Sequence, residues 1–578
     1  MTTIFNTYNK VSRRTGTIAL SLSLLLTASS CSGFLEILPP NDVVLENYWT
    51  EKNDVTSVLF SCYESLESEE SMLRMGVWGE LRSDNITPGR ATGNYDIQEM
   101  LKENILPTSS LVKWDVMYQT INRCNTVCHF APSVQKKDPN YSPDELNANI
   151  AEAVFIRDLC YFYLLRTFRD VPITFEASLD DQRDYRIPPT KFENGIDTLI
   201  ADLRKVEGYA VHRYVDDTRM QNREASRSAY ENNSRVTCLA IYALLADLNL
   251  WRGNYSEVVK YSDLVLDYKK EQYKKMRANL GNINDMYEFN GIPLILDKPE
   301  GNSNCGNMLT EIFGDKNSFE SLFELYFCNA NVTNSYISNY YGTASQKAGF
   351  FNAPSTYRKD VAEGKNVLFD KRDGRAYGSI LIDNTSYRIA KYSTSSVTFD
   401  NQNITDETSA KVKTNYRGDD YANWIVYRLT DVMLMKAEAL ILMGEDNYEE
   451  AFNLISAVNC RARSIKSATD KDALKFPDYN TPSKIINLLL DERNREFMYE
   501  GKRWYDLVRF SLRDGNTHTL VSKVTSVEEK YRGSNANAIK IKLSDPNIIF
   551  LPYYRDELKL NDYLKQNPAY GNTEEFVQ

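Results

Sequence analysis

The chain has 578 residues, so it can bury a large core, and length alone allows about three or four domains. Hydrophobic residues make up 42% and charged residues 25%, which indicates a globular protein. The formal net charge of −11 becomes −14 when the three cations of segment 1–30, which has no acid, are subtracted, and this acidity disfavours nucleic acid as a ligand. Only three His occur, so we predict no metal, no cofactor and no catalytic residue.

Residues 1–30 have the features of an export signal. Their cations precede the apolar run 18–26, which is too short to span a membrane permanently, and small residues then lead to Cys31. This arrangement resembles a bacterial lipobox, in which Cys31 would be diacylated on sulfur and become the mature N-terminus. At about 0.8 kcal/mol per buried methylene, such acyl chains anchor a protein stably to a membrane. The alternative is ordinary cleavage that leaves Cys31 free.

Helical periodicity dominates most of the remaining chain. Apolar residues recur at helical spacing in 55–66, 114–128 and 151–162. Segments 246–257 and 437–450 repeat one pattern: a helix with small residues, a tight turn containing Gly, an aromatic residue and a second helix. This is the physical logic of the tetratricopeptide hairpin, whose small residues let paired helices approach closely. We therefore predict an all-α fold, a tetratricopeptide-like helical hairpin scaffold with long irregular loop excursions and minor β structure.

The cysteines suggest packing rather than chemistry. Cys124, Cys128 and His129 lie close together, but no second pair gives the spacing of a zinc or haem site. The other cysteines are scattered and lie mostly on apolar helix faces. We expect mostly buried thiols in the core and leave the disulfide state open.

The main excursion from helical periodicity lies between about residues 270 and 424. Eight aromatic residues fall within 326–357, twice the density that the overall aromatic content of 12% gives, and asparagines lie among them. Flat rings can stack on sugar faces or peptide planes, while amides and carboxylates read hydroxyl groups. A ligand site is therefore expected here, with packing into the core as the alternative for each ring.

The segment 488–510 is the most regular in the chain and predicts two helices in tandem, with Gly501 capping the first. It resembles the C-terminal signature of the SusD/RagB family, roughly E-R-x-x-E-[FL]-x-x-E-G-x-R-[WF]-x-D-L-x-R. The matching residues are Glu492, Arg493, Glu496, Phe497, Glu500, Gly501, Arg503, Trp504, Asp506, Leu507 and Arg509. Opposite charges at these positions can form several bidentate pairs, which fix orientation more than they add stability.

The resemblance implies a nutrient-binding lipoprotein on the outer membrane. It divides the mature chain into an N-terminal part, 31–232, and a C-terminal part, 233–578, that form one compact unit. The family captures oligosaccharides and delivers them, without catalysis, to a SusC-like TonB-dependent transporter. Segment 78–85 resembles the stretch that precedes a variable, ligand-lining loop in relatives. The ligand-binding residues predicted on these grounds and from the aromatic cluster are Asp84, Asn85, Tyr95, Tyr336, Tyr340, Tyr341, Phe350 and Tyr357.

Three other functions remain open at this point. The same rings and amides could bind peptides, as in the RagB branch of the family. A lipid-anchored glycoside hydrolase could use a carboxylate pair such as Glu496 and Glu500, which one helix turn places near glycosidase distance. The nearby arginines argue against this enzyme, since they would hold both groups ionised. A purely structural surface protein would bind no soluble ligand.

Overall fold

Helices that follow one another along the chain pack side by side and form the scaffold of the protein. The computed structural model describes residues 48–89, 93–179, 184, 186–214, 232–281, 283, 285–299, 306–328, 332–342, 349–383, 386–399, 412–417, 421–467, 469–531 and 535–571. The chain divides into a unit of residues 1–50 and a unit of residues 51–578, and the second is the one described below. Cys31 and the export signal lie outside the described residues, and the predicted division at 232 and 233 stays a prediction.

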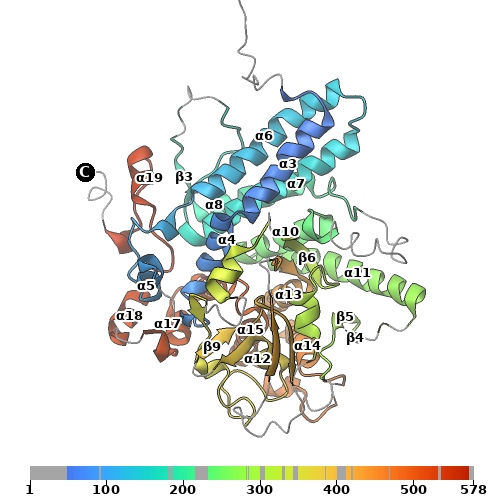
Figure 1. Cartoon of the computed structure of the whole chain (residues 1–578), viewed down its shortest axis with the longest axis vertical. Helices are drawn as coiled ribbons and strands as arrows, with labels where there is room; N and C mark the ends of the chain where they lie inside the picture. The colour runs from blue at the N-terminus through green and yellow to red at the C-terminus, as the bar shows by residue number, and fades with distance from the viewer. Residues whose placement is uncertain are drawn as a thin grey trace, which may run out of the picture. The chain divides into compact units, whose positions relative to one another are not determined.

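The long helices are α3 (Lys52–Glu67), α6 (Asp115–Lys137), α7 (Pro143–Phe168), α8 (Phe192–Val206), α10 (Cys238–Arg252), α11 (Tyr255–Leu280), α13 (Leu429–Met443), α14 (Tyr448–Ala462), α15 (Pro482–Phe497) and α16 (Arg503–Asp514). Each of these helices packs against the next one in the series, from α3 against α6 to α15 against α16 (Figure 1). The shorter helices are α4 (Glu69–Gly76), α5 (Tyr95–Leu101), α12 (Gly374–Ser379), α17 (His518–Thr525), α18 (Ala536–Leu543) and α19 (Arg555–Leu560). The mostly helical, tetratricopeptide-like fold with minor β structure is confirmed.

The repeated sequence pattern forms two helical hairpins. Gly253, at φ +85°, follows α10, and α11 begins at Tyr255. Gly444, at φ +118°, follows α13, and α14 begins after one short turn at Tyr448. Both glycines have backbone angles that disfavour other residues, which explains their place at the turns. Within the described residues, no helix is both long and apolar enough to cross a membrane.

The excursion between α11 and α13 holds most of the strands. They pair antiparallel in small sheets: β1 (Thr87–Pro88) with β7 (Phe351–Asn352), β2 (Val171–Pro172) with β3 (Pro189–Thr190), β4 (Met286–Phe289) with β5 (Ile292–Ile295), β6 (Ser321–Leu325) with β12 (Trp424–Arg428), β8 (Ile380–Asp383) with β9 (Ser386–Ile389), and β10 (Thr394–Phe399) with β11 (Val412–Tyr416). The β6–β12 pair is buried along its whole length and leads directly into α13, so it joins the excursion to the helical scaffold.

The tandem helices are confirmed, but the predicted cap is wrong. Helix α15 ends at Phe497, and Gly501 lies in the turn between α15 and α16 at φ +70°. A side chain on Gly501 would lie 2.9 Å from the carbonyl oxygen of Met75, and one on Gly79 would lie 1.8 Å from the carbonyl oxygen of Gly501. The two glycines thus let two distant backbones meet in the core. Helix α3 begins at Lys52 with a capping box between Glu51 and Asp54.

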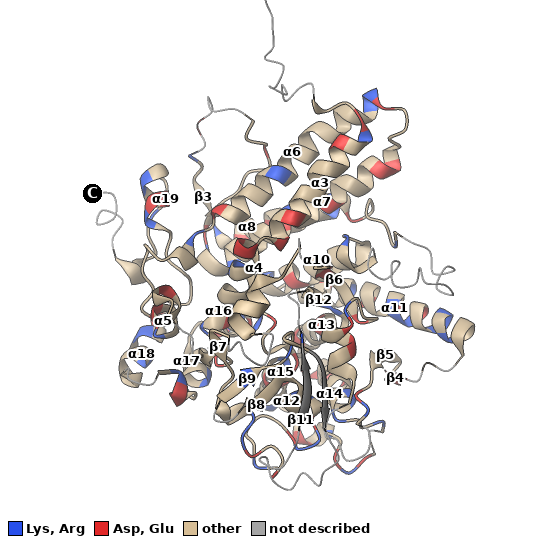
Figure 2. Cartoon of the chain, viewed as in Figure 1, with Lys and Arg blue, Asp and Glu red and all other residues tan. Residues whose placement is uncertain are grey.

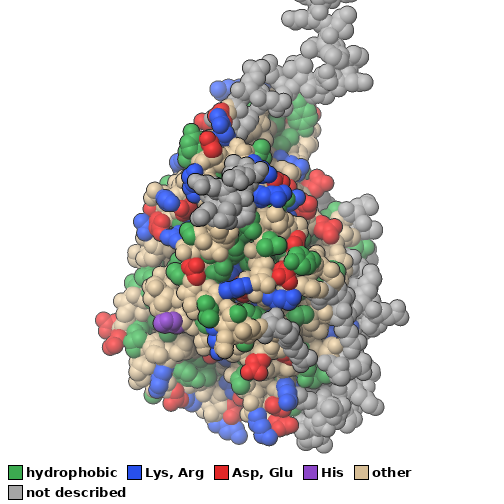
Figure 3. All heavy atoms as spheres, turned by 90° about the vertical axis from the view of Figure 1, so that its left-hand side faces the viewer, with side chains coloured by type: hydrophobic (Ala, Val, Ile, Leu, Met, Phe, Trp, Pro, Cys, Tyr) green, Lys and Arg blue, Asp and Glu red, His purple; other side chains and the backbone are tan. Residues whose placement is uncertain are grey.

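The outer helices carry acidic and basic residues intermixed, with Lys and Arg conspicuous along α11 and α18 (Figure 2). On the face that carries α5, α18 and α19, apolar side chains lie scattered among charged ones (Figure 3). Exposed apolar residues in single places are normal for a soluble surface. The buried residues and the cavities of this unit therefore tell more about function than its overall surface composition.

The turn after α7 is strained at Arg169. Its φ and ψ are +73° and −74°, and the Asp170 N–H donates to the Phe168 carbonyl at 3.1 Å, which together define a γ-turn with positive φ. We expect Arg169→Gly to stabilise the fold by about 1 kcal/mol. Glycine relieves backbone strain of about 1–3 kcal/mol, and the greater conformational entropy of glycine in the unfolded chain offsets part of this gain. The free energy of unfolding, measured in urea, checks this prediction. Lys540→Gly on α18 is a control that should destabilise the fold.

Candidate functional site

The signature residues of α15 and α16 lie at the centre of a buried ion network. We use that name for Arg375, Lys391, Arg428, Arg461, Glu492, Glu496 and Glu500. Glu496 accepts hydrogen bonds from arginines on three separate elements: Arg375 of α12 at 2.7 Å, Arg428 of β12 and Arg461 of α14. Glu500 pairs with Arg428 at 2.8 Å and with Lys391 at 2.7 Å. The network therefore ties the tandem helices to the excursion and to the second hairpin.

This network leaves no acid–base couple for catalysis. Burial alone would raise the pKa of Glu496, but Arg461, Arg428 and Arg375 hold it well below its usual range. The pKa of Glu500 is lowered in the same way, against burial, by Arg428 and Lys391. Both carboxyl groups are 2% exposed, so no substrate reaches them. A glycosidase needs one carboxyl group that holds a proton, and neither of these does.

A second buried carboxylate, Glu80, holds the turn between α15 and α16. Its two oxygens accept the backbone N–H groups of Tyr499 and Gly501 at 3.0 Å and of Lys502 at 3.2 Å. The side-chain amide of Asn85 donates to it at 2.8 Å. Burial raises the pKa of Glu80 to about 7, although these hydrogen bonds favour the ionised form.

Three residues of the predicted ligand set lie beside this turn. Asp84 forms a bidentate pair with Arg503 at 2.7 and 2.8 Å, and it also accepts the hydroxyl of Tyr357 at 2.8 Å. Asn85 contacts Glu80 as above. Asp84, Asn85 and Tyr357 are all buried in this conformation, so the structure brings them together in the core.

The predicted aromatic residues also pack inward. Tyr336 is 1%, Tyr340 is 8% and Tyr341 is 1% exposed, and their rings contact one another at centroid distances of 4.9 and 5.3 Å. Tyr341 donates its hydroxyl to the Tyr499 carbonyl at 3.0 Å. Of the whole predicted set, Tyr95 is 61% exposed and Phe350 is partly exposed. Ligand contact by these residues stays a prediction.

The described unit has a different feature that can hold a ligand, a cavity of about 450 Å³ between α6, the segment around β2 and β3, and α19. Its lining residues are Trp114, Asp115, Tyr118, Ile121, Asn122, Asn125, Pro172, Thr174, Glu176, Ser178, Arg186, Ile187, Glu557, Leu560, Asn561 and Leu564. We call it the α6–α19 pocket. Its volume is within the range of small-molecule sites, and its floor is mostly apolar.

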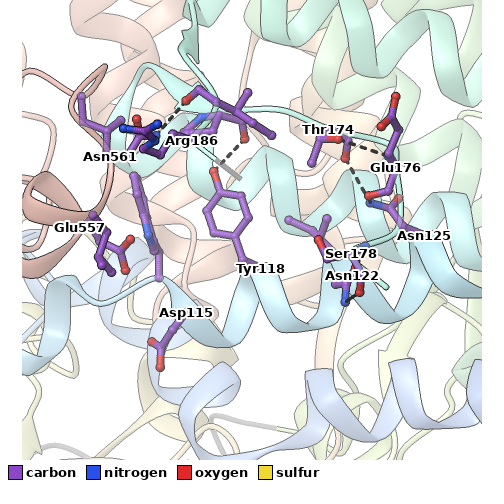
Figure 4. Close-up of a pocket in the computed structure, with 16 residues that line it drawn as sticks. Asp115, Tyr118, Asn122, Asn125, Thr174, Glu176, Ser178, Arg186, Glu557 and Asn561 are labelled. Atoms are coloured by element: carbon purple, nitrogen blue, oxygen red, sulfur yellow. Dashed lines mark hydrogen bonds between the residues drawn. The ribbon is translucent and has the colours of Figure 1, made fainter. Parts of the chain in front are cut away.

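The walls of the α6–α19 pocket are held by side chains of α6. Tyr118 donates its hydroxyl to the Pro172 carbonyl at 2.8 Å, and the Ser178 N–H donates to the Asn122 side chain at 2.7 Å. The Asn125 amide donates to the Thr174 and Glu176 carbonyls, both at 3.2 Å. Figure 4 shows the ring of Tyr118 between the Glu557 side of the pocket and the Asn122 side. The amides are thus used to fix the wall, which leaves the pocket preformed.

On the opposite side, α19 contributes Glu557 and Leu560, and Asn561 just beyond it donates to the Ile187 carbonyl at 2.9 Å. Burial raises the pKa of Glu557, a shift that a hydrogen bond with Trp114 partly offsets. Arg186 is paired with Asp184 at 2.8 Å. The polar groups left to face a ligand are mainly the carboxylates of Asp115, Glu176 and Glu557 and one hydroxyl group. They surround the ring of Tyr118.

Sequence reasoning missed this pocket, although it did place Trp114 and Tyr118 on one helical stripe. The pocket's walls come from residues 114–125, 172–178, 186–187 and 557–564, which only the folded chain brings together. The signal available in the sequence was the spacing of Tyr118, Asn122 and Asn125, which puts a ring and two amides on one helix face.

Comparison with known proteins gives consistent matches. A model described as the SusD family matches residues 212–570. SusD-like protein P38 of Formosa agariphila is 23% identical over 512 residues, covering 85% of this chain and 90% of its own length. A crystal structure of a SusD superfamily protein from Bacteroides thetaiotaomicron superposes with a TM-score of 0.61 at 21% identity, covering 90% of this chain and 99% of that one. A structure described as a laminarin binding SusD-like protein gives 0.58 at 20% identity, covering 90% and 100%.

The ion network predicts how stability depends on pH. Since the pKa of Glu496 is lowered on folding, its stabilising effect is present above the unfolded value of about 4.5 and is lost as the pH falls toward the folded value. Glu496→Gln should cost about 3–5 kcal/mol at pH 7, because it leaves buried arginines unpaired, and should flatten the fall in stability below pH 4.5. Guanidinium unfolding from pH 3 to 7 checks this; Glu449→Gln on the exposed side of α14 should change neither quantity.

Proposed function

The chain belongs to the SusD family, since the model of that family matches more than half of its residues, and we propose that it captures oligosaccharides at the cell surface and delivers them to a SusC-like TonB-dependent transporter. Members of this family are binding proteins without catalytic activity. The paired state of Glu496 and Glu500 supports this reading, because the carboxylate pair named above as a candidate for hydrolysis is occupied by arginines.

The single observation that carries the ligand proposal is the α6–α19 pocket. It combines a preformed apolar floor, the partly exposed ring of Tyr118, and carboxylates at the rim. A sugar ring presents a C–H face that packs on apolar and aromatic surface and hydroxyls that donate to carboxylates. Because Asp115, Glu176 and Glu557 outnumber the single, paired Arg186, we propose a neutral oligosaccharide rather than a sulfated or uronic one.

The proposed location is the outer membrane, facing outward, with Cys31 as the lipid-attachment site. The support is the order of cations, apolar run and small residues before Cys31, together with the family. A lipid anchor holds the chain beside the transporter without a spanning helix. The transporter partnership rests on the family alone.

Titration of the mature protein should find a neutral-glycan ligand, with laminarin oligosaccharides as the first probe because a related structure is described as laminarin binding. Ser178→Trp places a large ring at an exposed position of the pocket wall and should weaken binding at least tenfold with little change in stability. Tyr95→Ala is the matched control on α5. If Tyr95→Ala abolishes binding and Ser178→Trp does not, the ligand lies at the loop that the sequence indicated. Binding of peptides and of no glycan would favour the RagB-like alternative.

The anchor is tested separately. Cys31→Ala should release the chain from the membrane fraction, because alanine has no sulfur to carry the acyl chains that supply the membrane affinity. Fractionation without detergent, followed by labelling with a palmitate analogue, measures this; Cys328→Ala, at an exposed cysteine, should leave labelling intact. Copurification of a barrel protein with the wild type supports the partnership, and a soluble, unlabelled wild type would contradict the anchor.

A further inference from the structure

Two cavities adjoin along the edge of the helical scaffold, away from the residues that line the α6–α19 pocket. Their volumes are about 480 and 500 Å³. They share the lining residues Arg169, Glu193 and Phe550, so they lie next to each other, and we call the two together the Arg169 groove. One cavity is lined by α7, α8 and the segment 547–568; the other is lined by α10, α13 and α16, helices that lie together in the middle of Figure 2.

The walls of the Arg169 groove hold more basic than acidic residues, in an acidic protein. They contain six Lys and Arg residues and three Asp and Glu residues, while the chain as a whole has a net charge of −11. The cations are Arg169, Lys191, Arg252, Arg509, Arg513 and Lys565. Four of them already pair with carboxylates: Arg509 with Glu438 at 2.7 Å, Lys191 with Asp170 at 2.6 Å, Arg252 with Asp197 at 2.7 Å and Arg513 with Asp514 at 2.7 Å.

Other cations of the groove remain available to a ligand. Among the described residues, neither Arg169 nor Lys565 has a carboxylate partner, and Arg169 lies over the ring of Phe550 with 5.8 Å between the guanidinium carbon and the ring centroid. Both are exposed. The groove thus presents two cations without a carboxylate partner: Arg169 at the wall shared by the two cavities, and Lys565 in the first cavity.

From these features we propose that the Arg169 groove binds an acidic, extended peptide segment of a partner protein. Two adjoining cavities fit an extended chain, whose carboxylates pair with Arg169 and Lys565. Apolar wall residues, among them Phe192, Leu250 and Phe550, leave room for apolar side chains between the acidic ones.

The test uses the full mature chain and a fluorescein-labelled hexapeptide of alternating leucine and acidic residues. Fluorescence polarisation should show saturable binding that weakens as salt rises, and the same peptide with glutamine and asparagine in place of the acids should bind at least tenfold more weakly. Arg169→Gly combined with Lys565→Ala should weaken binding of the acidic peptide at least tenfold. Arg169→Gly relieves the strained turn, so loss of binding cannot be ascribed to unfolding.

Lys540→Glu, on α18, is the matched control and should leave peptide binding unchanged. Equal binding of the acidic and amide peptides, or undiminished binding by the double variant, would overturn the proposal. Tighter binding of an oligogalacturonate than of the peptide would also overturn it, since the groove would then be a site for acidic glycans. Binding of neutral glycan by the double variant should match that of the wild type, so this result is independent of the proposed glycan pocket.

Discussion

The structure depends on one buried charge, the carboxylate of Glu496. It is bound by Arg375, Arg428 and Arg461, which belong to a short helix of the excursion, a buried strand and the second helical hairpin. Three parts of the chain that share no continuous hydrophobic stripe therefore meet at one group. Burying a charge is costly unless it is fully paired, and here each wrong arrangement would leave arginines unpaired in the core. The signature around Glu496 thus selects one arrangement of the excursion on the scaffold, more than it adds stability.

Two glycines allow a close contact between distant parts of the backbone in the core. Gly79 and Gly501 let the backbone near α4 touch the turn between α15 and α16, and Glu80 then accepts the N–H groups of that turn. Any side chain at these glycines would collide with backbone, which cannot move aside as a flexible side chain can. Gly501, the glycine of the signature, therefore has a packing explanation that needs no ligand.

The sequence predicted the scaffold well because its signals are local. Gly253 and Tyr255, and their counterparts Gly444 and Tyr448, fix the turns of the hairpins by spacing alone. The role of Gly501 could not be predicted, because it depends on Met75 and Trp424, which are distant in sequence. The ring-rich stretch was ambiguous for a different reason: Tyr336 and Tyr341 have the same composition signal whether they pack in a core or face a sugar, and only the fold separates the two.

The α6–α19 pocket shows why a cavity can be invisible in sequence yet well formed. The side chains of Asn122 and Asn125 form hydrogen bonds with the backbone of the facing wall, so they shape the pocket, and in our proposal recognition falls to Tyr118 and the rim. A wall held in this way loses little freedom when a ligand binds, and a weak set of contacts then suffices for useful affinity. This arrangement suits the function proposed above, in which the protein releases its ligand to a neighbour, because an affinity that comes from shape and few polar contacts allows fast dissociation.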